Sequence, residues 1–116
     1  MSNTIKIAIP LAEGKLSMHF GHCETFALVE VDLAAKKIIG RTDLIPPPHE
    51  PGVIPKWVAA QGAELILAGG MGQRAQDIFT ENRVKVMVGM PSSTPEELVG
   101  QYLKGTLQAG ANVCDH

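Results

Sequence analysis

The side chains best suited to hold a metal are confined to three short segments of the chain. Imidazole and thiolate groups bind soft and borderline metals, and the sequence contains four His and two Cys in 116 residues. These six residues are His19, His22, Cys23, His49, Cys114 and His116. Two Cys in a chain without a recognisable signal peptide argue against a disulfide framework and leave metal or redox chemistry open.

The densest group of such residues is the segment Ser17-Met18-His19-Phe20-Gly21-His22-Cys23. In a loop, His19, His22 and Cys23 can converge on one centre, and Met18 adds a soft or apolar contact. In an extended segment, His19 and Cys23 share one face while His22 points the other way. The alternative interpretation is a glycine-containing turn whose His side chains cap backbone groups.

Two further segments carry the remaining candidates. The Cys-x-His spacing of Cys114 and His116 can bring both side chains to one centre, although chain ends are also commonly frayed. His49 and Glu50 lie in the proline-rich stretch 46–52, a stiff loop that can hold an imidazole outward at low entropic cost. The alternative interpretation of His49 is an ordinary surface residue.

A glycine-rich turn, Gly69-Gly70-Met71-Gly72, separates an expected strand from an expected helix. Open α/β sheets bind ligands at the carboxyl ends of their strands. The N–H groups and partial positive charge of a helix start favour an anion there. The pattern matches neither G-x-G-x-x-G nor a phosphate-binding loop with its Lys. A tight strand-to-helix turn is the alternative, but it leaves the Met unexplained.

Hydrophobic patterning predicts one α/β domain over 1–116 with a mixed five-stranded sheet, in the order β-β-β-α-β-α-β-α. Hairpins should join the first three strands, and crossover helices should make the later strands parallel. The first strand should end at Pro10, and the last helix should open on a capping box at Thr94 and close at Gly105. The expected strands are 5–9, 25–31, 37–45, 64–68 and 84–88, and the expected helices are 53–61, 73–82 and 94–105.

Composition excludes several partners. The net charge is −2, the basic residues are scattered and aromatic residues make up 4%, so the chain has neither a basic stripe nor a stacking platform for nucleic acid. No stretch approaches the roughly 20 apolar residues of a membrane span. We therefore expect a cytoplasmic protein that binds neither nucleic acid nor membrane.

Together these segments form a recognisable pattern. His19-Phe20-Gly21-His22-Cys23-x-x-Phe26 resembles the hallmark of the dinitrogenase iron–molybdenum cofactor biosynthesis family. The segments 47–52 and 68–72 and the closing Cys114-Asp115-His116 are also similar to segments of its small single-domain members. The resemblance covers nearly the whole chain, and it implies a ribonuclease H-like fold. Family members include carriers of the iron–molybdenum cofactor and the orange protein of sulfate reducers, which holds a molybdenum–copper sulfide cluster.

The resemblance and the clustered ligands lead to one main hypothesis, a non-enzymatic carrier of an anionic metal–sulfur cluster containing molybdenum with iron or copper. Such a carrier would exchange its cluster with donor or acceptor proteins. One wall of the site would be His19, His22 and Cys23, with Met18 beside them; the floor would be Gly69, Gly70, Met71 and Gly72; and His49, Cys114 and His116 would close the site. A mononuclear zinc or iron site is the alternative, and a thiol-dependent enzyme using Cys23 or Cys114 is a third hypothesis.

Overall fold

The structure is a computed structural model and describes residues 3–17, 24–48 and 52–107. Its strands are β1 (Thr4–Ala12), β2 (Lys15–Leu16), β3 (Thr25–Asp32), β4 (Lys37–Leu44), β5 (Ala63–Leu67) and β6 (Lys85–Met87). Its helices are α1 (Val53–Ala60), α2 (Gln73–Glu81) and α3 (Pro95–Lys104). The order of elements agrees with the prediction, apart from the added strand β2.

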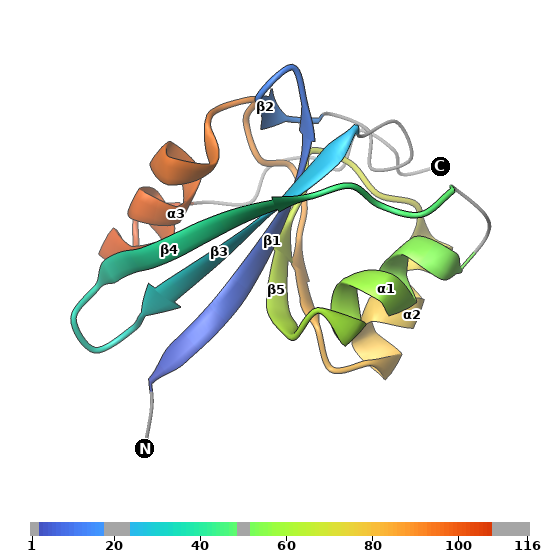
Figure 1. The fold of residues 1–116 in the computed structure, drawn as a ribbon, viewed down its shortest axis with the longest axis horizontal. Helices are drawn as coiled ribbons and strands as arrows, with labels where there is room; N and C mark the ends of the chain where they lie inside the picture. Colours follow the sequence, from blue (N-terminus) through green and yellow to red (C-terminus); the bar gives the residue numbers. More distant parts are fainter. Residues whose placement is uncertain (1–2, 18–23, 49–51, 108–116) are drawn as a thin grey trace.

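The strands form one mixed sheet in the order β4-β3-β1-β5-β6, and the short β2 pairs with β1. β3 runs antiparallel to both β1 and β4, whereas β5 runs parallel to both β1 and β6. The predicted mixture of hairpins and parallel crossovers is therefore confirmed. Because β1, β5 and β6 are parallel, their carboxyl ends lie at the same end of the sheet (Figure 1).

Side chains alternate between the two faces of the sheet, and each face has its own apolar cluster. On one face, Ile7 and Ile9 of β1 are fully buried in a cluster that contains Leu98 and Val99 of α3. On the other face, Ala8 belongs to a cluster covered by α1 and α2. Figure 1 shows α3 on one side of the sheet and the other two helices on the opposite side. The sheet is thus a central layer between helices.

The turn between β3 and β4 shows why a hairpin forms without an Asn-Gly or Asp-Gly pair. Asp32 Oδ1 accepts hydrogen bonds from the N–H groups of Ala34 (2.9 Å) and Ala35 (3.1 Å). Lys36 then takes a left-handed conformation with φ 55°, which reverses the chain. A short polar side chain that bonds the backbone two or three residues ahead thus replaces the expected turn glycine.

The predicted end of the first strand at Pro10 is wrong, because β1 continues to Ala12. A proline lacks the N–H donor that a central strand normally needs. β1 pairs with β5 only as far as Ala8, so Pro10 lies beyond that ladder and does not interrupt it. The backbone carbonyl of Pro10 still accepts a hydrogen bond from the N–H of Ser17 at 2.8 Å.

The strand β2 was not predicted, because two residues are too short to show a hydrophobic period. It pairs with β1 through Leu11↔Leu16 and Ala12↔Lys15. Between these pairs, Glu13 and Gly14 both have positive φ (55° and 81°), which is the geometry of a tight two-residue hairpin.

The predicted ends of α3 are confirmed. The Thr94 hydroxyl accepts a hydrogen bond from the N–H of Glu97 at 3.4 Å, and Pro95 occupies the first turn. Gly105 follows the helix with φ 76°, a conformation that glycine adopts without strain.

Candidate functional site

The carboxyl ends of β1, β5 and β6 gather the loops that carry the candidate residues or lead to them. β1 is followed by the β2 hairpin, β5 by the glycine turn, and β6 by the loop that leads to α3. Backbone hydrogen bonds join these loops: Leu16 N–H donates to Ser93 O at 3.0 Å, and Gly89 N–H donates to Gly69 O at 2.9 Å. These contacts form one connected rim at this end of the sheet.

The two residues that flank the His and Cys segment 18–23 are both attached to the end of β1. Ser17 N–H donates to Pro10 O at 2.8 Å, and Glu24 N–H donates to Leu11 O at 2.7 Å. Ser17 is also buried, with 5% of its surface exposed. Met18, His19, His22 and Cys23 themselves lie outside the described residues. Both flanks of this segment are therefore held at the carboxyl end of β1, the strand next to β5 in the sheet.

The glycine turn is held against the loop after β6. Met90 N–H donates to Ala68 O at 3.1 Å, and Ala68 N–H donates to Met87 O at 2.9 Å. Gly69 and Gly70 are buried, and Gly72 is exposed. A Cβ atom added to Gly72 would have no heavy atom within 4 Å, so the end of the turn has space for a ligand or a side chain.

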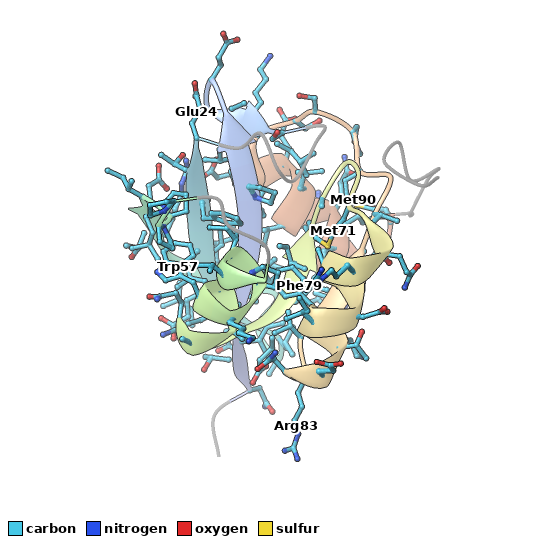
Figure 2. All side chains as sticks on the ribbon, turned by 90° about the vertical axis from the view of Figure 1, so that its right-hand side faces the viewer. Glu24, Trp57, Met71, Phe79, Arg83 and Met90 are labelled. Carbon is cyan, nitrogen blue, oxygen red and sulfur yellow. The ribbon has the colours of Figure 1, made fainter. Side chains whose placement is uncertain are left out.

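Met71 occupies the apolar core beneath the turn. Its side chain is completely buried in the cluster that includes Phe79 and Val84, and Figure 2 shows it inside the molecule, close to Phe79. This burial explains why an apolar residue interrupts the glycines, since Met fills irregular gaps in a core. Any contribution of residue 71 to the floor of a site would therefore come from its backbone.

The start of α2 is open to an anion. The residue before α2 is Gly72, which has no side chain to cap the helix, and the first turn contains no acidic residue. Arg74 lies in this turn and is exposed. The nearby α3, by contrast, is capped by Thr94 and carries two acidic residues in its first turn. Uncapped N–H groups and the helix dipole both favour negative charge, so α2 provides the more suitable anion site.

The loop that contains His49 enters α1 next to α2. His49 lies outside the described residues, but Gly52, which precedes α1, is close to α2. A Cβ atom added to Gly52 would lie 3.5 Å from Cδ1 of Ile78. The end of this loop therefore lies beside the helix that begins at the glycine turn.

The last described residue is Leu107, which follows α3 and packs against the apolar cluster on that face of the sheet. α3 runs back from the rim, and its Tyr102 lines a hollow of about 350 Å³ with Ile5 and Leu33. Leu107 N–H donates to Gln101 O at 3.3 Å in the same helix. Cys114 is seven residues further along the chain, a distance of at most about 25 Å when fully extended. Cys114 and His116 lie outside the described residues.

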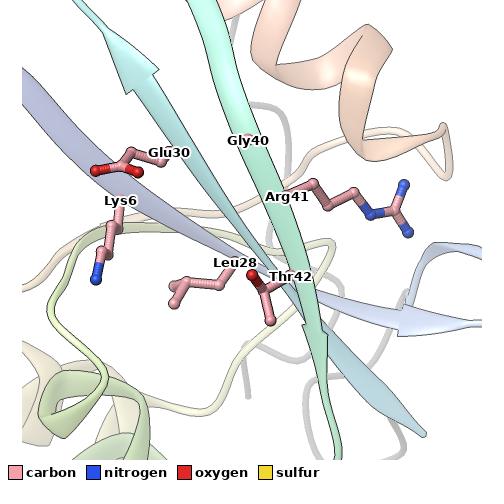
Figure 3. A pocket seen from close by; sticks show the side chains of 6 residues that line it. All are labelled: Lys6, Leu28, Glu30, Gly40, Arg41 and Thr42. Atoms are coloured by element: carbon pink, nitrogen blue, oxygen red, sulfur yellow. The ribbon is translucent and has the colours of Figure 1, made fainter.

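A second hollow, of about 280 Å³, lies on the surface formed by β1, β3 and β4 and is drawn in Figure 3. Its charged side chains include Lys6 and Glu30, which face each other across β1 and β3. Arg41 leaves β4 on the other side and donates to Asp43 and Glu96, both at 2.7 Å. The hydrogen bond from Arg41 holds the pKa of Glu96 below its usual value. Neither hollow is lined by a predicted site residue.

All four His and both Cys fall in the segments outside the described residues. Within the described ranges, no group of three or more His, Cys, Asp or Glu side chains could hold a metal ion. The structure therefore places the flanks of the 18–23 segment, the glycine turn and the start of α2 at the same end of the sheet. The positions of the six predicted ligands stay a prediction.

Sequence analysis named Ser17 only as the first residue of the segment 17–23 and did not single out Arg74. Arg74 could have been found from its place, because it is the second residue of the helix that follows the glycine turn. Ser17 carried no such signal, since its burial depends on the backbone of β1.

This arrangement defines a small α/β protein with a mixed sheet and a potential anion site at the carboxyl ends of its parallel strands. The chain belongs to the dinitrogenase iron–molybdenum cofactor family, whose model matches residues 3–105. The family predicted from the sequence motifs is thus confirmed.

Individual relatives extend the comparison. The chain is 28% identical over 107 residues to the uncharacterised protein MJ0580 of Methanocaldococcus jannaschii, with 90% of each chain covered. The structure is similar to that of PH0822, with a TM-score of 0.82, 23% identity and coverage of 90% of this chain and 94% of the other. It is also similar to the apo form of the orange protein from Desulfovibrio gigas, with a TM-score of 0.71, 23% identity and coverage of 97% and 98%. These structures share the fold.

No helix in the described part of the chain is long and apolar enough to cross a membrane.

Proposed function

We propose that this protein binds and carries an anionic metal–sulfur cluster, of the iron–molybdenum or molybdenum–copper sulfide kind, and does not catalyse a reaction. The observation that carries the proposal is the start of α2, which has no side-chain cap and follows the glycine turn directly, at the same end of the parallel strands as the attached flanks of the 18–23 segment. Membership of a cofactor-related family supports the same class of ligand.

A preformed cluster suits these residues better than a bare metal ion does. It brings its own sulfides, so it needs fewer protein ligands than an all-Cys iron–sulfur site, which takes four thiolates. Its negative charge would be stabilised by the N–H groups and dipole of α2 and by Arg74. His19, His22 and Cys23 would supply the nitrogen and sulfur ligands, and Met18 would add a soft or apolar contact.

His49, Cys114 and His116 would close the site from the side, and Gly69 to Gly72 would form its floor. We propose that the protein works as one domain of ribonuclease H-like fold in the cytoplasm, where cluster-donor and cluster-acceptor proteins would load and unload it. The absence of a disulfide framework from the sequence suits that compartment.

The test is anaerobic reconstitution of the full chain with tetrathiomolybdate and Cu(I), and separately with molybdate, Fe(II) and sulfide. After desalting, visible absorption and the metal-to-protein ratio report a bound cluster. We expect uptake by the wild type, and uptake reduced about tenfold in His22→Ala and Cys23→Ser. Lys15→Ala, an exposed change on the neighbouring hairpin, is the matched control and should bind normally.

Three outcomes would overturn the proposal. One is a protein that stays colourless both from its native host and after reconstitution. Another is a single zinc or iron ion held by four N or S ligands, with a chelator-sensitive melting temperature. A third is a defined turnover that is lost in Cys23→Ala or Cys114→Ala while metal uptake is unchanged.

A further inference from the structure

The large apolar side chains that are exposed in the described residues gather on one hairpin. They are Leu33 (39% exposed), Ile38 (38%), Ile39 (54%) and Ile45 (83%). All of them lie in the turn after β3, in β4 or directly after it. Apolar side chains grouped along the edge of a sheet mark a surface that another strand can pair with.

β4 is the edge strand on this side of the sheet. One side of its backbone pairs with β3, and no described element pairs with the other side. A bulge places Ile39 outside the β3 ladder, between the pairs Glu30↔Gly40 and Val31↔Ile38. Since a bulge interrupts regular pairing, the regular part of this edge runs from residue 40 to the end of β4.

We propose that this edge pairs antiparallel with β4 of a second copy of the chain, so that the two sheets become continuous in a symmetric dimer. This inference goes beyond the cluster-carrier function and does not depend on it. The occupant follows from the self-complementary sequence of the edge, because a two-fold axis at Thr42 sets each charge opposite its counter-charge.

The alternation of side chains restricts the register. Residues that face each other across paired strands must point to the same face of the sheet. With Thr42 opposite Thr42 of the second copy, Arg41 faces Asp43 of the second copy, and Asp43 faces its Arg41. Gly40 then lies opposite Leu44, and the apolar Ile39 lies near Ile45 of the second copy.

The neighbouring symmetric registers are electrostatically unfavourable. Centring the axis on residue 41 sets Arg41 opposite Arg41, and centring it on residue 43 sets Asp43 opposite Asp43. Like charges directly opposite each other destabilise strand pairing. Registers centred nearer the start of β4 would have to pair across the bulge at Ile39. The register centred on Thr42 is therefore favoured on both grounds.

Arg41 and Asp43 are held side by side on one face of β4 by hydrogen bonds within the chain. Arg41 donates through Nε to Asp43 Oδ1 at 2.7 Å and through Nη2 to Asp43 Oδ2 at 3.0 Å. Figure 3 shows Arg41 and Thr42 leaving β4 on opposite sides. In the dimer, two Arg and two Asp side chains would alternate on the α3 face, and the two Thr42 side chains would meet on the other face.

The test is sedimentation velocity of the full chain from about 5 to 500 μM. We expect a concentration-dependent dimer, weakened at least tenfold by Asp43→Arg alone and by Arg41→Asp alone. An equimolar mixture of these two variants should restore the dimer, because one carries only positive and the other only negative charge at positions 41 and 43. Lys85→Glu, on the opposite edge strand, is the control and should dimerise normally.

A second measurement is cysteine cross-linking, which leaves the charges of Arg41 and Asp43 unchanged. Thr42→Cys, combined with Cys23→Ser and Cys114→Ser, should cross-link to a second copy on mild oxidation, because the two positions face each other at the axis. Lys37→Cys in the same background should not. A chain that stays monomeric at 500 μM would overturn the proposal. So would mixed variants that do not associate, or a dimer that cross-links equally at both positions.

Discussion

Met71 illustrates what burial decides at the scale of one residue. Its place among three glycines suggested a soft contact for a ligand, but its side chain is completely buried with Phe79. Gly72, at the end of the same turn, is exposed and has open space around the position of a Cβ atom. The side chain of Met71 therefore supports the turn from below, while Gly72 leaves room at the surface.

At Arg83, the backbone conformation affects stability more than the chemistry of the side chain does. It follows α2 with φ 64°, a left-handed conformation that costs a non-glycine residue roughly 1 kcal/mol. Arg83→Gly should raise the free energy of unfolding by up to about 1 kcal/mol, because glycine adopts this conformation without strain. Urea denaturation is the measurement. Glu81→Gly, at the last residue of α2, is the control and should not raise stability; a loss of stability in Arg83→Gly would contradict the interpretation.

At the scale of the element, the two helices that begin at the rim have opposite electrostatics. α3 starts with a Thr cap and two acidic residues, so its N–H groups and dipole are already compensated. α2 starts at Gly72 with neither. The difference comes from a few residues at each helix start. It makes the N-terminus of α2 the place where the proposed anion would bind.

Gly72→Asp should separate stability from ligand binding. The backbone of Gly72 is extended, with φ −65° and ψ 154°, and no heavy atom would obstruct a new side chain. A carboxylate here should cap α2 and raise the free energy of unfolding by several tenths of a kcal/mol up to about 1 kcal/mol. It should also repel an anionic cluster and lower its uptake at least tenfold.

The matched control for that change is Gly72→Asn, which also caps the helix but adds no charge. It should stabilise the protein to a similar degree in urea denaturation and lower cluster uptake less than Gly72→Asp does. Equal uptake by the wild type and Gly72→Asp would mean that the start of α2 does not contact the cluster.

The ion pairs of Arg41 join β4 to the start of α3 and should make stability depend on pH. Because Arg41 lowers the folded-state pKa of Glu96 below its usual 4.5, the pair stabilises the fold above that value. The contribution is lost as the pH falls through the folded pKa. The Glu96 side chain is 53% exposed, so solvent screening limits the effect to less than about 1 kcal/mol.

Glu96→Gln should therefore lower stability slightly at pH 7 and have a smaller effect at pH 3, as measured by urea denaturation at both values. Glu97→Gln, one residue further along the first turn of α3, is the control. Its effect should not depend on pH in this way, because Arg41 bonds Glu96. An equal effect of Glu96→Gln at both pH values would rule out the ion pair as its cause.

At the scale of the whole molecule, the parallel strands bring distant parts of the sequence to one end. The flanks of segment 18–23 are bound to β1, and the glycine turn follows β5, more than forty residues later. α3 runs back from this end, so its Tyr102 lines a hollow together with Ile5, near the other end of β1.

Removal of residues 108–116 tests the role of the C-terminal tail. The shortened chain keeps every residue of the described apolar clusters, so it should still fold cooperatively in urea denaturation. Cluster uptake should fall if Cys114 and His116 close the site. Cys114→Ser with His116→Ala in the full chain should reproduce that loss, and normal uptake by both proteins would restrict the site to the 18–23 segment and the glycine turn.

The sequence by itself determined the order of the elements, the ends of α3 and the family. These features depend on local physics: the hydrophobic period, the Thr94 cap, the glycine after the helix, and motifs contained in a few consecutive residues. Only the tertiary structure decided that β1 continues through Pro10, that β2 forms, that Met71 is buried and that α2 starts at the same end of the sheet as the flanks of segment 18–23. Each of these depends on which strand lies next to which. Non-local pairing decides whether the missing N–H of Pro10 and the short strand β2 are tolerated, and burial decides whether the apolar side chain of Met71 is.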